Sequence, residues 1–222
     1  MTTTWWHRRL AGVTLAAATL GMVAGCSAPA AGGGSAQHEL DRLTVVTRPA
    51  DDGTYRRAAF GPAWSDVDGN HCRQRSDALF WTLDRSQPYV VRQQGRCGHD
   101  VVAGTWTDPY TGRRMTFTNL HDPAQARAIP VDHRVSLASA WRYGASSWSD
   151  QKRLRFANDL ENLQPTTERA NSAKGGDDAA SWRPRQAGQC EFASAYVATK
   201  KRYELPVDRS EKRALTEMLQ HC

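Results

Sequence analysis

The sequence predicts an α+β fold, in which short strands and short helices follow one another without regular alternation. Two β-like segments near the middle of the chain are joined by a strong turn sequence, which predicts a hairpin. Segments with helical spacing of apolar residues lie on both sides of this hairpin. The sequence contains no internal repeat and no second linker, so these elements are expected to form one domain.

The first residues have the features of an export signal. Arg8 and Arg9 precede an apolar stretch whose length suits a signal peptide and is short for a membrane-spanning helix. Residues 23–26 (Val-Ala-Gly-Cys) resemble a bacterial lipobox, which implies cleavage before Cys26 and attachment of lipid to it. An ordinary signal peptide is the alternative. We therefore expect residues 1–25 to be a lipoprotein signal peptide.

A tether is expected to separate the signal from the folded domain. The residues from Ser27 to about Gln37 are mainly Ala, Gly, Ser and Pro, and none of them is charged. Such a composition buries too little apolar surface to fold and is typical of a flexible linker. We expect residues 26–38 to form this tether and residues 39–222 to form the domain.

The first half of the domain is expected to contain the hairpin and two short segments before it. Residues 55–64 predict a short helical or irregular segment that a Gly-Pro pair ends, and residues 76–83 predict a helix. The hairpin strands are expected at 101–106 and 115–118. Residues 108–112 (Asp-Pro-Tyr-Thr-Gly) join them, with Pro and Gly at positions that favour a tight turn.

The second half is expected to alternate between short helices and two very short strands. Capping residues and apolar spacing mark the helix starts and faces. The expected strands are 129–133 and 162–164, and the expected helices are 136–143, 149–158, 167–174 and 209–220.

An acidic loop precedes the helix at 76–83. Asp66, Asp68 and Asn70, with Asp77 at the twelfth position, resemble the spacing of a calcium-binding loop. The glycine required in such a loop is displaced, and a cysteine lies inside it. We therefore expect a turn here and not a calcium site.

Four cysteines remain when Cys26 is assigned to the lipid anchor, and this even number suits an oxidising compartment. Four cysteines allow three pairings. We favour Cys72–Cys97 and Cys190–Cys222, because each pair closes a modest loop and the second secures the last residue. The alternative is a zinc site made of His71-Cys72 and Cys97-Gly98-His99, which the absence of Cys-x-x-Cys spacing disfavours.

Three groups of polar residues follow one another in the second half of the chain. They are Asp132-His133, Asn162-Leu163 and Asn171-Ser-Ala-Lys174, each on an expected strand or helix. This ordered set resembles the HNH, or ββα-metal, nuclease motif. More specifically, the chain is similar to small exported HNH endonuclease family proteins, whose nuclease domain also occurs at the C-terminal end of certain modification-dependent restriction enzymes.

The wider similarity covers most of the chain after the tether. It includes Phe60-Gly-x-Ala-Trp64-x-Asp66-Val-Asp68, Gly104-x-Trp106-x-Asp108-Pro-Tyr-Thr-Gly112, Ala140-Trp141, Phe156-Ala-Asn158-Asp159 and Cys222. The resemblance implies a ββα-metal nuclease core at about residues 127–180, with an additional β-hairpin and flanking helices. Its two strands would be separated by a helical insertion of 28 residues, from Arg134 to Glu161.

The residue types fit hydrolysis of a phosphodiester, which needs a base for the attacking water and a cation for the leaving oxygen. His133 suits the general base, because imidazole titrates near neutrality. Asp132, on the other side of the strand, and Asn171, on the following helix, would supply hard oxygen ligands. Because the last ligand is Asn where the commoner motif has His, Mg²⁺ is expected first and Mn²⁺ second. Asn158 is a rival for a ligand role.

The remaining residues of the motif are expected to support this chemistry. Asn162 would bridge the hairpin as a structural residue. Lys174 shares a helix face with Asn171 and would contact phosphate. Removing Arg8 and Arg9 leaves 27 basic and 23 acidic residues, a net charge of +4.

The basic excess crowds the second half of the chain, where it would attract phosphate or an anionic membrane surface. We expect contacts to nucleic acid from Arg153, Arg155 and Arg169. The resembling proteins add Arg75, whose alternative role is an ion pair with Asp77 or Asp66.

These features together predict an exported, metal-dependent endonuclease of DNA, with RNA as a second substrate, that uses His-activated water and one divalent metal. The alternative is a catalytically inactive surface lipoprotein that binds a ligand or partner. The expected partners are nucleic acid and, through the lipid on Cys26, a membrane; the sequence indicates no obligate protein partner. The expected location is the outer face of the cell membrane, or the medium after secretion.

Overall fold

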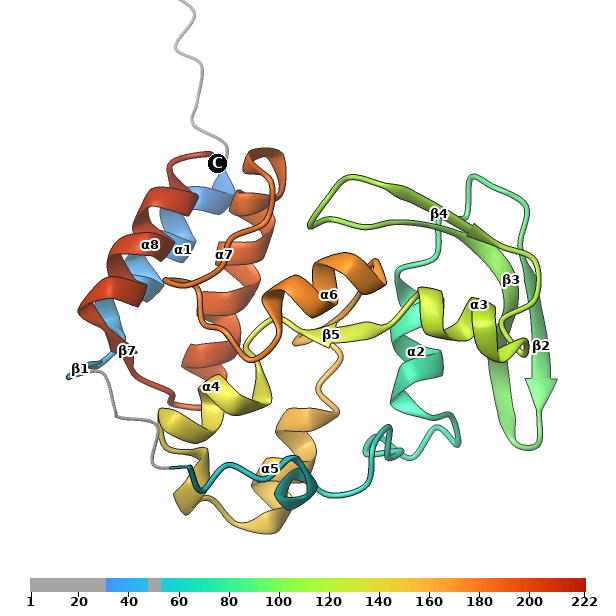
Figure 1. Ribbon diagram of the computed structural model, residues 1–222, viewed down its shortest axis with the longest axis horizontal. Helices are drawn as coiled ribbons and strands as arrows, with labels where there is room; N and C mark the ends of the chain where they lie inside the picture. Colours follow the sequence, from blue (N-terminus) through green and yellow to red (C-terminus); the bar gives the residue numbers. More distant parts are fainter. Residues whose placement is uncertain (1–30, 48–52) are drawn as a thin grey trace, which may run out of the picture.

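A computed structural model describes residues 31–47 and 53–222. The expected signal peptide and lipidation site, Cys26, lie outside these residues. Helices and short strands follow one another in an irregular order, which confirms the predicted α+β class. Three groups of elements lie side by side in Figure 1: a group of helices, a central pair of strands with its helix, and a three-stranded sheet.

The helical group contains the two ends of the described chain. It consists of α1 (Ala31–Arg42), α7 (Gln186–Arg202) and α8 (Arg209–Leu219), with two parallel two-residue strands, β1 (Val45–Val46) and β7 (Val207–Asp208), beside them. Helix α1 packs against both α7 and α8. The apolar centre of this group belongs to the largest core cluster of the protein.

Helix α1 corrects the predicted tether. Residues 31–38 were expected to be flexible, and the domain was expected to start at Glu39, but this stretch is helical. Ala36 and Leu40 share one face of the helix and are buried in the core that α7 and α8 contribute. Burial of one apolar face outweighs the poor helix propensity of the preceding glycines. The prediction failed because it judged composition without this tertiary contact.

The sheet lies at the opposite end of the molecule. Its strands are β2 (Val90–Gln94), β3 (Cys97–Thr107) and β4 (Arg114–Phe117), flanked by helices α2 (Gln74–Trp81) and α3 (Pro123–Ala128). β3 and β4 form the predicted hairpin, in which Trp106 pairs with Met115. Gly112 ends the turn with φ +71°, which glycine adopts without steric cost. Strand β2 was not predicted from the sequence.

The central group joins these two ends. Strands β5 (Val131–His133) and β6 (Leu163–Pro165) pair antiparallel, so that Asp132 lies opposite Gln164, and helix α6 (Glu168–Lys174) follows directly. Between the strands lie α4 (Leu137–Arg142), the 3-10 helix η2 (Ala145–Ser147) and α5 (Asp150–Ala157). This strand–helices–strand–helix order is the one that the resemblance implied. It brings segments 30 residues apart into one small hairpin.

Side-chain caps set the starts of the central helices. Ser136, Ser149 and Thr167 each accept a hydrogen bond from the backbone N–H three residues later, at the start of α4, α5 and α6 respectively. Such caps satisfy amide groups that a helix leaves without internal partners, and each contributes about 1 kcal/mol. The cap of α6 therefore fixes where the helix that carries Asn171 begins.

A separate segment covers the lower side of the central group. It contains the 3-10 helix η1 (Arg57–Phe60), which packs against α5 and α4. Arg153, from α5, donates a hydrogen bond to the carbonyl oxygen of Ala59 at 2.9 Å. Phe60 is buried against Phe156 and Trp141. These contacts hold the segment against the helices that separate β5 from β6.

Two disulfides join segments that are distant in sequence. They are Cys72–Cys97, which connects the start of α2 to β3, and Cys190–Cys222, which connects α7 to the last residue. These are the two pairings that the sequence analysis favoured. None of the helices within residues 31–47 and 53–222 is long and apolar enough to cross a membrane.

Candidate active site

Asp132 and His133 lie at the end of β5 and line one cleft of about 330 Å³. Asn171, from α6, lines the same cleft, and so do Tyr55 and Arg57 from the segment that contains η1. The antiparallel pairing with β6 turns α6 back beside β5, which is why residues 38 positions apart in sequence meet here. The three residues that the sequence analysis assigned to chemistry are therefore together.

The His133 ring is buried, with 6% of the residue exposed, and is held by a backbone carbonyl. Its Nε2 lies 2.8 Å from the carbonyl oxygen of Ala157, at the end of α5. A carbonyl can only accept, so Nε2 carries the proton and Nδ1 has the free lone pair. The ring of Trp64 lies parallel to the imidazole, with 6.3 Å between centroids.

Burial lowers the pKa of His133 to about 4. Desolvation is the largest cause, and the positive charges of Arg57 and Lys174 act in the same direction. The hydrogen bond to Ala157 and the charge of Asp132 oppose the shift without cancelling it. His133 is therefore neutral at pH 7, which is the form that can accept a proton.

The Asp132 carboxylate is buried and fully engaged on one side. The Lys174 ammonium lies 3.2 Å from Oδ1 and 3.0 Å from Oδ2, and the Tyr110 hydroxyl donates to Oδ2 at 2.9 Å. Lys174 also donates to the carbonyl oxygen of His133 at 2.7 Å. The lysine thus joins both residues of the Asp-His pair, and Oδ1 keeps an acceptor position for a further partner.

This arrangement does not support the phosphate contact expected of Lys174. The residue is only 1% exposed, and its ammonium is directed at Asp132 and at the β5 backbone. Lys174 lies on the same helix as Asn171, as predicted, but its ammonium points into the protein and not toward the position expected for phosphate. Lysine side chains are usually exposed. On the seven-residue helix α6, the Asp132 carboxylate compensates for the burial of the Lys174 ammonium.

Asn162 and Asn171 have different surroundings. Asn162 is fully buried; its Oδ1 accepts from the N–H of Val135 at 2.8 Å, and its Nδ2 donates to the carbonyl oxygen of Val135 at 3.1 Å. The amide thereby extends the β5–β6 pairing beyond the last strand residue. Asn171 is half-buried on the cleft side of α6, and within the described part of the chain its side-chain amide has no hydrogen-bond partner.

The turn between β3 and β4 also reaches the site, through Asp108. The Asp108 carboxylate accepts hydrogen bonds from the hydroxyls of Thr166 and Thr167 and from the N–H of Thr167. Tyr110, two residues later, is the residue that contacts Asp132. The sequence analysis noted the segment Gly104–Gly112 as part of the resemblance but assigned it no role. The structure gives it one: it connects the hairpin turn to the start of α6.

Two of the four arginines expected to bind nucleic acid are used inside the protein. Arg75 donates to the carbonyl oxygens of Ala126 and Ile129 at 2.9 and 3.0 Å, at the end of α3. Arg153 is buried and donates to the carbonyls of Ala59 and Ala145. These expectations are corrected, because both guanidinium groups satisfy buried carbonyls.

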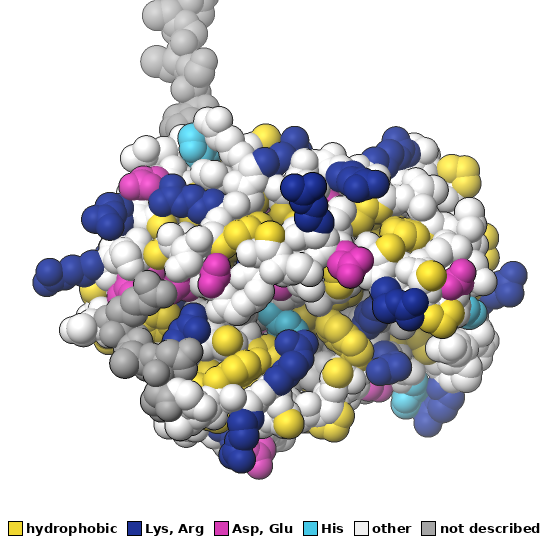
Figure 2. Space-filling model, viewed as in Figure 1, with side chains coloured by type: hydrophobic (Ala, Val, Ile, Leu, Met, Phe, Trp, Pro, Cys, Tyr) yellow, Lys and Arg dark blue, Asp and Glu magenta, His cyan; other side chains and the backbone are white. Residues whose placement is uncertain are grey.

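Arg155 and Arg169 are exposed, so their expected contacts stay predictions. On the face that carries β5 and α6, Lys and Arg side chains are spread widely and outnumber Asp and Glu (Figure 2). A face of this kind attracts phosphate backbones without selecting a sequence.

Arg57 reaches the cleft although the sequence analysis did not identify it. It is the only Lys or Arg among the described residues that line the cleft, and it also lines a small adjoining pocket with Trp64, His133 and Asn158. No carboxylate within residues 31–47 and 53–222 forms an ion pair with it. No local sequence signal distinguishes Arg57 from Arg56, since only the tertiary fold directs it to His133.

The cleft offers the hard oxygen donors that a divalent cation such as Mg²⁺ prefers. These are the Asp132 carboxylate, through Oδ1, and the side-chain oxygen of Asn171. A second group of metal-ligating residue types, Cys72, Cys97 and His99, lies elsewhere in the described chain. Its two sulfur atoms form a disulfide, so they are not thiolate ligands, which agrees with the preference against zinc.

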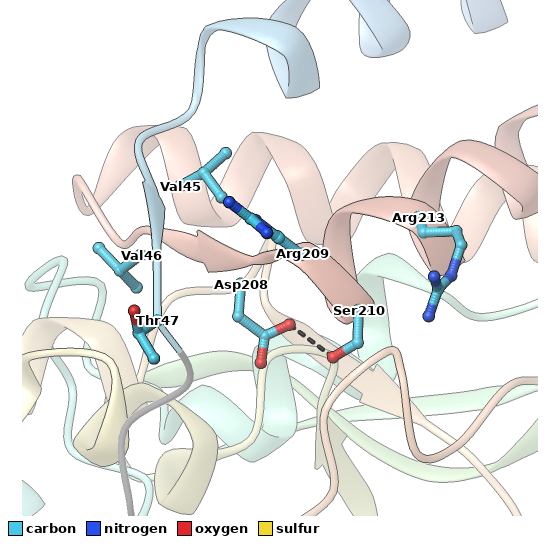
Figure 3. A pocket seen from close by; sticks show the side chains of 7 residues that line it. All are labelled: Val45, Val46, Thr47, Asp208, Arg209, Ser210 and Arg213. Atoms are coloured by element: carbon cyan, nitrogen blue, oxygen red, sulfur yellow. Dashed lines mark hydrogen bonds between the residues drawn. The ribbon is translucent and has the colours of Figure 1, made fainter.

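A larger hollow, of about 650 Å³, lies far from this chemistry at the start of α8. Figure 3 shows Val45, Val46 and Thr47 on one side of it and Ser210 and Arg213 on the other. Asp208 accepts a hydrogen bond from the Ser210 hydroxyl at 2.6 Å and caps the helix. The described residues that line this hollow include no histidine, so its size alone does not make it the better candidate for an active site.

Comparison with known proteins gives an independent result. The sequence model of a protein family described as "GmrSD restriction endonucleases, C-terminal domain" matches residues 75–218. A protein of Arthroderma benhamiae named "Uncharacterized secreted protein" is 36% identical over 191 residues, which are 85% of each chain. No solved structure matches the chain. The family match includes β5, β6 and α6 and excludes the segment that carries Arg57 and Trp64.

Proposed function

Because the chain belongs to the family of C-terminal domains of GmrSD restriction endonucleases, we propose that it is an exported, metal-dependent endonuclease. Its proposed substrate is DNA first and RNA second, and its reaction is hydrolysis of a phosphodiester bond by a water molecule that His133 activates. The observation that carries this proposal is the meeting of His133, Asp132 and Asn171 in one cleft.

His133 is proposed as the general base. Ala157 holds Nε2–H, so Nδ1 is the nitrogen that would accept the proton of the attacking water. The lowered pKa keeps this nitrogen unprotonated at neutral pH. The parallel ring of Trp64 and the carbonyl together fix the plane of the imidazole. A base fixed in this way loses little freedom when the substrate binds.

Asp132 and Asn171 are proposed to hold one divalent cation, Mg²⁺ first. When bound, the cation would offset the negative charge of the phosphate and of the leaving oxygen. Lys174 and Tyr110 would keep the Asp132 carboxylate in one orientation, with Oδ1 available on the cleft side. Asn162 is proposed as a structural residue that keeps β5 and β6 paired at the end nearest the site.

Arg57 is proposed to bind the scissile phosphate. A guanidinium offers paired donors that match two phosphate oxygens, and Arg57 is exposed at the cleft without a carboxylate partner among the described residues. Arg155 and Arg169 are proposed to contact more distant phosphates. Arg153 has a different part, because it holds the segment that presents Arg57.

Export is proposed from the signal-like start of the chain, with lipidation at Cys26 and a location on the outer face of the membrane. The two disulfides suit an oxidising compartment, and the relative from Arthroderma benhamiae is named a secreted protein. Mass spectrometry of the N-terminal peptide tests the lipid directly. An unmodified Cys26 would contradict the anchor and leave secretion without it.

Incubation of the purified protein with supercoiled plasmid and Mg²⁺ or Mn²⁺ tests the activity. We expect conversion to nicked circles that stops when EDTA is added, because the leaving oxygen then loses its counter-charge. A matched reaction with single-stranded RNA compares the two substrates. Absence of cleavage with either ion would contradict the proposal and favour the alternative, a surface protein that binds nucleic acid or another ligand without cutting it.

A further inference from the structure

We propose that the loop from Asp66 to Asp77 is a second metal site, which binds Ca²⁺ in the manner of an EF-hand loop and is separate from the cleft. An EF-hand loop has twelve residues and uses positions 1, 3, 5, 7, 9 and 12 as ligands, position 7 through its backbone carbonyl. Counted from Asp66, these positions are Asp66, Asp68, Asn70, Cys72, Gln74 and Asp77. Helix α2 begins at Gln74, as the exiting helix of such a loop does.

The sequence alone argued against this site because the required glycine is displaced from the sixth position and Cys72 lies inside the loop; at position 7, however, an EF-hand loop uses only the backbone carbonyl, so the Cys72 side chain is not needed as a ligand. In EF-hand loops this glycine allows the sharp turn that the chain makes there. The structure removes the objection, since His71 occupies the sixth position with φ +68° and so makes a left-handed turn with a side chain present. Gly69, at the fourth position, is also left-handed, with φ +78°. The backbone therefore follows the path that the ligand spacing requires.

The carboxylates at positions 3 and 12 converge, although they come from the loop and from the helix. The Asn70 side-chain NH₂ group lies 3.2 Å from Asp68 Oδ2 and 3.2 Å from Asp77 Oδ1, so it stands between them. A divalent cation among these oxygens would offset the repulsion between neighbouring carboxylates.

Within residues 31–47 and 53–222, two buried oxygen atoms at the proposed ligand positions have no hydrogen-bond partner. Asp77 is 0% exposed, and its Oδ2 has no hydrogen-bond partner, while Oδ1 is shared by Asn70 and by His99 at 2.5 Å. Gln74 is buried too, and its Oε1 likewise has no partner. A buried polar atom without a partner destabilises the folded protein. That two such atoms occupy positions 9 and 12 is the observation, independent of the loop's shape, that points to a cation.

The location explains what bound Ca²⁺ would do. The loop begins two residues after Trp64, whose ring lies parallel to that of His133 with 6.3 Å between centroids, and it ends in α2, whose Ala78 packs with Val131 and Leu163 of the β5–β6 hairpin. The Cys72–Cys97 disulfide fixes the middle of the loop to β3. A cation in the loop would therefore brace one wall of the cleft. Extracellular calcium modules typically bind with Kd of about 10⁻⁴–10⁻³ M, which suits an exported protein.

Calcium titration of the full chain, freed of metals with EDTA and dialysed, tests the site. With about 10 mM CaCl₂ we expect Tm to rise by about 3–10 °C, and calorimetry to give a Kd in the range above. Asp68→Asn removes a ligand charge from an exposed residue while keeping its hydrogen-bonding shape, and should raise Kd at least about 10-fold. Asp132→Asn is the matched control for Ca²⁺ in the cleft and should retain the calcium-dependent rise in Tm.

The outcomes separate this site from the proposed nuclease. No rise in Tm with Ca²⁺ in the wild-type protein would overturn the inference, whether or not plasmid is cleaved. A rise that Asp132→Asn abolishes and Asp68→Asn keeps would also overturn it, because the calcium would then bind in the cleft. Failure of plasmid cleavage together with a rise that depends on Asp68 would contradict only the nuclease. If Asp68→Asn fails to fold, Asp66→Asn serves as the second variant.

Discussion

Two buried lysine–carboxylate pairs in the described part of the chain are built alike. In the helical group, the Lys200 ammonium lies 2.5 Å from Glu211 Oε2, the Tyr196 hydroxyl donates to Oε1 at 2.6 Å, and Lys200 also donates to the carbonyl oxygen of Pro206. In the central group, Lys174, Asp132 and Tyr110 repeat the same set, with the carbonyl of His133 as the backbone acceptor.

Only the surroundings of the two pairs differ. Glu211 is 0% exposed and lies among α7 and α8, whereas Asp132 is 6% exposed and lines the cleft beside His133 and Asn171. The helical pair therefore has only a structural role, and the central pair combines that role with a place in the proposed active site. A buried ion pair alone does not identify an active site. The proposal rests on the position of the central pair beside an open cleft and a neutral histidine.

Neutralising each carboxylate in turn distinguishes the structural role from the proposed catalytic role. Of the predictions made here, it has the largest expected effect on the rate of plasmid cleavage. Asp132→Asn should lower the rate of plasmid cleavage per folded molecule by about 10³-fold, because the proposed metal ligand loses its charge. Glu211→Gln should leave that rate within about twofold. Initial rates, corrected for the folded fraction by circular dichroism, give the comparison. Equal losses in the two variants would show that Asp132 acts only through stability.

Stability should respond in the same way at both pairs. Lys174→Met and Lys200→Met each leave a buried carboxylate without its counter-charge and should lower the free energy of unfolding by about 3–5 kcal/mol. The double variant Lys200→Met with Glu211→Leu should recover most of that loss and full activity. Lys174→Met with Asp132→Leu should recover stability only. Urea denaturation and plasmid cleavage of the four variants measure both quantities.

The proposed reaction in the cleft should also need an arginine, Arg57, to bind phosphate. Arg57→Ala should lower kcat/KM by about 10²-fold, since a charged contact to phosphate contributes about 2–3 kcal/mol. Its neighbour Arg56 is exposed but does not line the cleft, so Arg56→Ala is the matched control and should change kcat/KM less than twofold. The salt dependence of DNA binding should lose a slope of about 1 only in Arg57→Ala. Identical behaviour of the two variants would exclude Arg57 from the site.

The histidine beside the central pair should give the protein an acid-sensitive stability. The pKa of His133 is about 4 when folded and about 6.5 when unfolded, so the unfolded chain takes up the proton first as the pH falls. Stability is then complete above about pH 6.5 and decreases toward pH 4; by pH 4.5 the loss is about 2–3 kcal/mol. Urea denaturation at pH 7 and pH 4.5 should show this difference, and His133→Gln should lack it. An equal difference in both proteins would assign it to other groups.

The sequence predicts the placement of the central residues well. Asp132, His133 and Asn171 line one cleft and Asn162 extends the β5–β6 pairing, because a strand–strand–helix unit keeps them in short, ordered motifs. Their roles in catalysis stay predictions. Lys174 was found for the same reason, but its direction was wrong, since sequence position does not distinguish a buried ion pair from an exposed cation. Arg75 and Arg153 failed in the same way, because each satisfies backbone carbonyls that only the fold brings near.

The sequence does not predict the elements that lack a one-sided apolar pattern. Helix α7, the longest in the described chain, buries residues on several sides, among them Phe192, Tyr196 and Lys200, because α1, α8 and the Tyr110 region all pack against it. The sequence predicts a tether where α1 lies, because its glycines conceal the two buried positions, Ala36 and Leu40. Arg57 carries no local signal. In each case the missing information is a tertiary contact.

The most direct test of the central claim is plasmid nicking by His133→Ala in Mg²⁺ beside a matched histidine variant. His221 is exposed and lies near the end of the chain, so His221→Ala controls for loss of an imidazole elsewhere. We expect His133→Ala to cleave at least about 10³-fold more slowly than wild type and His221→Ala to cleave normally. Cleavage by folded His133→Ala at the wild-type rate would contradict the assignment of His133 as the base, and with it the account of this cleft.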